Sequence, residues 1–172
     1  MPIREVRRSL DSGFNAEDPG EPQPFCEQFS VEPPTRSRSS FFYNQSSNSS
    51  FSESIFSYPT EQGATAAFEQ DRAIASRCNE QTSVFNGLPV TYRIASAARD
   101  VSRLSGGAIA VRYTAEDADG RALVTGYAVV RRIGSIVVSA NYEVYFRELD
   151  NKELDDFLDL TEAAFNRVGE TL

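Results

Sequence analysis

Histidine is absent from this chain, which removes the most common general base at neutral pH. Ser-His and Cys-His nucleophile pairs are excluded for the same reason, and so are most zinc sites. The two cysteines, Cys26 and Cys78, are too few for a four-cysteine zinc site. Most familiar hydrolase mechanisms are therefore excluded, while chemistry based on carboxylates stays open.

Positive charge is scarce as well. The formal net charge is -8 and the sequence pI is about 4.6. Phosphate groups repel an acidic surface, and such a surface releases no counterions when it meets nucleic acid. We therefore expect no binding to nucleic acid or to anionic membranes.

Long apolar runs are also missing. None approaches the roughly 20 residues that a membrane-spanning helix needs. The first residues, MPIREVRRSLDSG, carry charge but lack the apolar segment of a signal peptide. The chain is therefore expected to be either cytoplasmic or a mature exported chain whose export segment has been removed.

The composition is that of a globular protein. The chain has 172 residues, of which 40% are hydrophobic, so we expect a single domain over residues 1–172. Residues 1–34 are predicted to be irregular, with a turn-rich stretch AEDPGEPQP and one possible short helix in REVRRSLDSGF. A hairpin is predicted over 35–58, around the polar loop NQSSNSS. A helix capped by Thr60 is predicted over 60–78.

Strands are predicted over 84–146. The stretch 84–94 is expected to form a strand pair or one bent strand, and the following apolar alternation predicts a three-strand antiparallel meander. A last helix is predicted over 150–168, where Asp150 and Glu153 fit a capping box. We predict an α+β fold, in which an antiparallel sheet made of the C-terminal meander and the N-terminal hairpin packs against two or three helices.

Arginines and tyrosines alternate along the predicted strands and are the candidate ligand-binding residues. If they share a face of the sheet, they could line a groove for an anionic or polar-headed ligand. The alternative is that the arginines pair with Glu143 or Asp117 or lie on a solvated face. Strand register decides between these readings. The candidates are Arg93, Arg112, Tyr113, Tyr127, Arg131 and Tyr145.

No metal or cofactor site is expected. Capping and solubility account for most carboxylates of ELDNKELDDFLD, and DADGRA lacks the ligand pattern of an EF-hand. The cysteines leave two alternatives, a disulfide or a buried thiol in a cytoplasmic protein. A catalytic thiol at Cys78 is disfavoured, because no histidine could activate it and a helix C-terminus disfavours the thiolate.

Several segments, taken in order, resemble a known family. They are SLDSGF, the lone cysteine after a Pro-rich stretch, SYPTEQGATAAFEQDRAIASRC, ARDVSRL, VVRRIGSIVVSANY and LTEAAFNRV. Together they are similar to the PknH-like extracellular sensor domains, which also occur in actinobacterial lipoproteins and secreted proteins. No kinase domain accompanies them in this chain.

The resemblance implies a secreted or lipid-anchored, non-enzymatic domain with a ligand-sized cleft. The ligand would be a small molecule, a lipid or a fragment of the cell envelope. A structural or protein-interaction module without a small ligand is the alternative. The resemblance also implies a disulfide between Cys26 and Cys78, although members of the family often carry two disulfides and this chain can form only one. In the chain-entropy model, closing such a loop contributes roughly 4 kcal/mol to stability.

Overall fold

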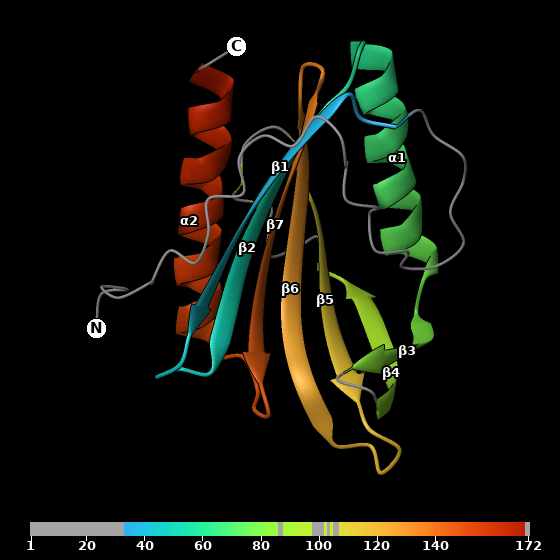
Figure 1. The fold of residues 1–172 in the computed structure, drawn as a ribbon, viewed down its shortest axis with the longest axis vertical. Coiled ribbons are helices and arrows are strands. Elements are labelled where there is room, and N and C mark those ends of the chain that lie inside the picture. The colour runs from blue at the N-terminus through green and yellow to red at the C-terminus, as the bar shows by residue number, and fades with distance from the viewer. Residues whose placement is uncertain (1–32, 86–87, 98–101, 103, 105–106, 171–172) are drawn as a thin grey trace.

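The computed structural model describes residues 33–85, 88–97, 102, 104 and 107–170 (Figure 1). The irregular segment and the possible first helix predicted before residue 33 lie outside these ranges. The described elements follow in the order β1 (Arg36–Asn44), β2 (Ser49–Ser57), α1 (Glu61–Arg77), β3 (Glu80–Phe85), β4 (Leu88–Ser96), β5 (Ile109–Glu116), β6 (Ala122–Ile133), β7 (Ile136–Tyr145) and α2 (Asn151–Glu170).

All seven strands belong to one antiparallel sheet, in the order β1-β2-β7-β6-β5-β4-β3. The predicted fold class is therefore wrong, because strands dominate and the sheet is not a three-strand meander plus a hairpin. The stretch that the sequence left as a strand pair or a bent strand forms β3 and β4, which extend the sheet beyond β5. The polar segment EQTSVF of β3 lacks regular alternation, which is why its pattern did not predict a strand.

The hairpin β1–β2 joins the meander at β7, the last strand of the chain. Phe51 lies opposite Tyr142, and Ile55 lies opposite Val138. These pairs bury the apolar side chains of β2 on the same side of the sheet as those of β7. The pairing also leaves β7 in the interior of the sheet, between β2 and β6.

Helix α1 carries the chain from β2 to the opposite edge of the sheet. The Thr60 hydroxyl accepts a hydrogen bond from the amide of Gly63 at 3.1 Å, which confirms the predicted N-cap. Ala64, Ala67 and Phe68 are buried against the sheet, where they pack with Val137. The helix contacts β4, β5, β6 and β7.

Helix α2 begins with the predicted capping box. The Glu153 amide donates to Asp150 Oδ1 at 2.8 Å, and the Asp150 amide donates to Glu153 Oε2 at 3.3 Å. The helix continues to Glu170, two residues past the predicted end at 168. Phe157 and Phe165 are almost completely buried and form the centre of the largest core cluster.

The two helices cover opposite faces of the sheet. Along β7, Val138 and Ala140 pack with residues of α2, while Val137, the neighbour of Val138, packs with residues of α1. We call these sides the α2 face and the α1 face. Helix α1 lies beside the upper part of the sheet in Figure 1, and the strands continue well below it. Polar side chains can therefore occupy the lower part of the α1 face.

Candidate functional site

Two of the predicted ligand-binding arginines form exposed ion pairs. Arg112 donates to Glu148 at 3.0 Å. Arg93 donates to Glu116 at 2.9 Å and to Glu80 at 2.8 Å. These acids differ from Glu143 and Asp117, the partners that the sequence suggested.

Arg131 and Tyr127 belong to the packing between the sheet and α2. The guanidinium of Arg131 lies 5.5 Å from the centre of the Phe165 ring, and its Nη1 is 3.9 Å from Glu162 Oε2. Tyr127 is 1% exposed and its hydroxyl donates to the carbonyl of Ala97 at 3.3 Å. The structure does not bring these two residues together with the other tyrosines of the predicted set.

Tyr113 and Tyr145 do meet, on the α1 face, through the carboxylate of Glu143. The Tyr113 hydroxyl donates to Glu143 Oε1 at 2.7 Å, and the Tyr145 hydroxyl donates to Oε2 at 2.8 Å. Ser50 joins them, with its Oγ 2.9 Å from the Tyr145 hydroxyl and 3.3 Å from Glu143 Oε2. One carboxylate thus gathers three hydroxyls from β2, β5 and β7.

Two more tyrosines flank this carboxylate. The centroid of the Tyr92 ring lies 6.2 Å from the centroid of the Tyr113 ring. The ring of Tyr43 lies 6.1 Å from that of Tyr145, and its hydroxyl donates to Asn48 Oδ1 at 2.7 Å. We call the whole group the tyrosine–carboxylate cluster, which consists of Tyr43, Ser50, Tyr92, Tyr113, Glu143 and Tyr145.

Gly126 makes room for the buried member of the cluster. Gly126 lies between Tyr113 and Glu143 in the sheet register. A Cβ atom on Gly126 would lie 2.2 Å from Cζ of Tyr113, far inside contact distance. The absence of a side chain at this position therefore lets the Tyr113 ring lie across β6 toward Glu143.

The environment keeps these phenols protonated at neutral pH. Burial, followed by the negative charge of Glu143, raises the pKa of Tyr113 well above its ordinary value. Burial also raises the pKa of Tyr145 to about 12, and the charge of Glu143 adds to this effect while the hydrogen bond with Ser50 opposes it. Burial and Glu143 raise the pKa of Tyr92 in the same way. Tyr113 and Tyr145 therefore act as hydrogen-bond donors to Glu143.

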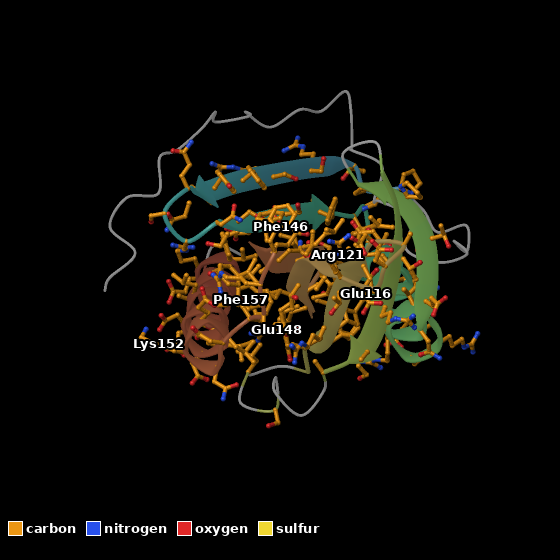
Figure 2. The ribbon with its side chains drawn as sticks, turned by 90° about the horizontal axis from the view of Figure 1, so that it is seen from below. Glu116, Arg121, Phe146, Glu148, Lys152 and Phe157 are labelled. Carbon is orange, nitrogen blue, oxygen red and sulfur yellow. The ribbon has the colours of Figure 1, made fainter. Side chains whose placement is uncertain are left out.

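The chain around Tyr145 is held in an unusual conformation. Asn48 and Phe146 both have positive φ, at 48° and 59°. The Tyr145 amide donates to the Asn48 carbonyl at 3.0 Å, and the Phe146 amide donates to that of Leu123 at 2.9 Å. Phe146 is nevertheless 66% exposed and lies at the end of the sheet (Figure 2). An exposed aromatic residue in the left-handed region beside the cluster is the kind of strain that often marks a functional site.

The cluster contains a negative charge at Glu143. No lysine or arginine in the part of the chain that the structure describes forms an ion pair with Glu143, whose partners are the three hydroxyls. Glu143 and Tyr145 are partly exposed, and Tyr43 is 40% exposed. Chemically, the cluster can attract a positively charged group and present aromatic rings to it.

Sequence reasoning considered Glu143 only as a partner for arginine, and it did not single out Ser50 or Tyr43. A signal was present in β7, where Asn141, Glu143 and Tyr145 alternate with residues of the α2 core. Such alternation indicates that polar side chains share one face. The contribution of β2 had no comparable signal, because its register against β7 depends on the assembled sheet.

Cys78 ends α1 and is 4% exposed. Its amide donates to the Ile74 carbonyl at 2.9 Å, and its side chain packs with Ile94 and Tyr113. Cys26 lies outside the described residues. The disulfide between the two cysteines therefore stays a prediction.

Within the described residues, no group of three or more histidine, cysteine, aspartate or glutamate side chains could hold a metal ion. Neither of the two described helices is long and apolar enough to cross a membrane.

Comparison with known proteins gives a likeness in structure. No family model matches the chain, and no curated protein matches it. Among solved structures, it is similar to the crystal structure of the extracellular domain of PknH from Mycobacterium tuberculosis, with a TM-score of 0.54. The chain shares the fold of that domain. The sequence identity is 14%, so the likeness shows the fold alone.

The PknH-like resemblance noted in the sequence is thus confirmed at the level of the fold. The match covers 76% of this chain and 66% of the PknH domain, just under two thirds of its length.

Proposed function

We propose that this chain is a non-enzymatic, extracytoplasmic domain of the PknH-like sensor type, which binds a small ligand on the α1 face. The observation that carries the proposal is the tyrosine–carboxylate cluster. It gathers aromatic and polar side chains from five strands, some buried and some exposed, on one side of a fold shared with an extracellular domain. Convergent polar groups among aromatic residues are typical of ligand sites.

The chemistry of the cluster supports binding over catalysis. The phenols of Tyr113 and Tyr145 hold their protons at neutral pH and donate them to Glu143. The chain contains no histidine that could act as a base near pH 7. What remains is a preformed set of donors, one carboxylate and aromatic rings, which suits recognition.

A ligand screen tests this proposal. The full chain would be titrated with representatives of four classes, namely organic cations, neutral glycans, lipids and anionic cell-envelope fragments, and followed by NMR of labelled tyrosine rings. We expect one class to shift the resonances of Tyr43, Tyr92 or Tyr145. If no class shifts them, small-ligand binding at this surface is wrong and a structural or protein-interaction role replaces it.

The export part of the proposal includes the disulfide between Cys26 and Cys78 and a secretion signal or lipid anchor on the native gene product. Intact mass with and without reductant, after purification under oxidising conditions, tests the bond. We expect a mass two hydrogens higher after reduction. Two reactive thiols in the oxidised sample would contradict it, and recovery of the native product from the cytoplasm would contradict export.

A further inference from the structure

We propose that the tyrosine–carboxylate cluster recognises an organic cation, such as a quaternary ammonium group, with Glu143 as its counter-ion and the tyrosine rings as its walls. This inference rests on the proposed ligand-binding function and names the chemical class of the ligand. It departs from the sequence-based expectation of an anionic ligand, because the arginines that suggested one lie elsewhere.

The charge of the cluster is the first feature that suits a cation. The three arginines expected to attract an anion, Arg93, Arg112 and Arg131, lie on the α2 face, with carboxylates 2.8–3.9 Å from their guanidinium groups. Glu143 on the α1 face receives only hydroxyl hydrogen bonds in the described chain. These donors stabilise its charge, and no lysine or arginine of the described segments pairs with it. A cation at this point would gain an attraction that an anion or a neutral ligand would not.

The tyrosine rings are the second feature that suits a cation. Tyr92 and Tyr113 lie on one side of Glu143, and Tyr43 and Tyr145 lie on the other, each pair in ring contact. The faces of tyrosine rings attract cations, and weakly hydrated quaternary ammonium groups are well suited to such contacts. Tyr113 is almost fully buried, so the rings of Tyr43, Tyr92 and Tyr145 are the ones that a ligand can reach.

The rigidity of the tyrosine side chains is the third feature. Two phenol hydroxyls are fixed on the two oxygens of Glu143, and Tyr43 is fixed by its bond to Asn48. Asn48 is itself tied to Tyr145 by hydrogen bonds in both directions. The rings are therefore held in place before a ligand arrives, which lowers the entropy lost on binding.

Choline and its neutral isostere 3,3-dimethyl-1-butanol provide a direct test on the full chain. The two molecules have the same shape and differ in charge, so their comparison isolates the cation. We expect choline to shift the labelled ring resonances of Tyr43, Tyr92 and Tyr145 at constant ionic strength, with a Kd at least tenfold lower than that of the isostere. Equal affinity for both molecules would overturn the inference.

Matched variants locate the site. Glu143→Gln should weaken choline binding at least tenfold, whereas Glu148→Gln, which alters an exposed carboxylate paired with Arg112, should leave it unchanged. Tyr43→Leu removes an exposed ring and should weaken binding roughly two- to fivefold. Phe41→Leu, an exposed ring two positions away on β1, is its control. Equal effects of a variant and its control would also overturn the inference.

The outcomes separate this inference from the proposed function. If choline does not bind but a neutral glycan or an anionic fragment shifts the same tyrosines, the cation is wrong and ligand binding stands. If wild-type protein responds to no class, both are wrong. Should Glu143→Gln lower the melting temperature strongly, Tyr43→Leu with its Phe41→Leu control still decides the question, because both side chains lie at the surface.

Discussion

The ring of Tyr113 lies directly over Gly126 on the neighbouring strand, so close that a Cβ atom at Gly126 would be 2.2 Å from Cζ of the ring. Gly126→Ala should therefore push the ring away from Glu143 and lower the free energy of unfolding by about 1 to 3 kcal/mol. Chemical denaturation measures this change. Gly169→Ala is the control, since nothing lies within 4 Å of the added methyl, and it should change stability by less than about 1 kcal/mol. Equal effects of the two variants would contradict the close contact.

Arg147 connects the β1–β2 turn with the start of α2. It donates to both oxygens of Glu153, at 2.7 and 2.5 Å, and to the carbonyl of Ser47 at 3.1 Å. Arg147→Ala should lower the free energy of unfolding by about 2 kcal/mol, because it strips charged hydrogen bonds from a partly buried network. Arg112→Ala breaks an exposed pair with Glu148 and should cost less than about 1 kcal/mol. A larger loss in Arg112→Ala would contradict this ranking.

Asp71 on α1 provides a prediction about pH. Burial raises the pKa of this carboxyl to about 6, so the folded chain favours its protonated form. Ionisation therefore weakens the fold as the pH rises from about 4 to 6. Asp71→Asn should be more stable than wild type at pH 7, by up to about 3 kcal/mol, and should lose this advantage below pH 4. Melting temperatures across this range measure the effect.

Two observations control the Asp71 experiment. Glu69→Gln, which changes an exposed acid on the same helix, should show little difference at any pH. The charge of Asp71 adds to burial in raising the pKa of Tyr58 to about 12, so Tyr58 should titrate at lower pH in Asp71→Asn. An advantage of Asp71→Asn that does not vary with pH would show that the carboxyl keeps an ordinary pKa.

Phe146 combines a left-handed backbone with an exposed side chain, so its replacement by glycine should be favourable. Phe146→Gly removes the steric cost of φ 59°. Because the Phe146 side chain is largely exposed, the change removes little buried apolar surface. It should raise the free energy of unfolding by about 0.5 to 1 kcal/mol. Asn48→Gly should instead lower stability, because asparagine tolerates this conformation and its side chain bonds to Tyr43 and Tyr145. Urea denaturation of both variants checks the opposite signs.

Most of the local elements could be predicted from the sequence. The Thr60 cap and the Asp150–Glu153 box appear in the structure because such caps depend on residues three positions apart. The alternation of the meander likewise reflects which side chains of one strand face the core. The size of the sheet could not be predicted from the sequence, because β3 shows no apolar alternation and β2 pairs with a strand far along the chain.

The candidate site divides along the same line. The sequence by itself determined that the chain is acidic, lacks histidine and carries tyrosines on strands that also contain arginines. Only the tertiary structure decided that Arg93, Arg112 and Arg131 lie on one face with carboxylate partners while Tyr113 and Tyr145 meet at Glu143 on the other. The physical reason is register. A shift of one residue moves every side chain of a strand to the opposite face, and the register of β2, β7, β6 and β5 is set by the packing of the whole sheet between α1 and α2.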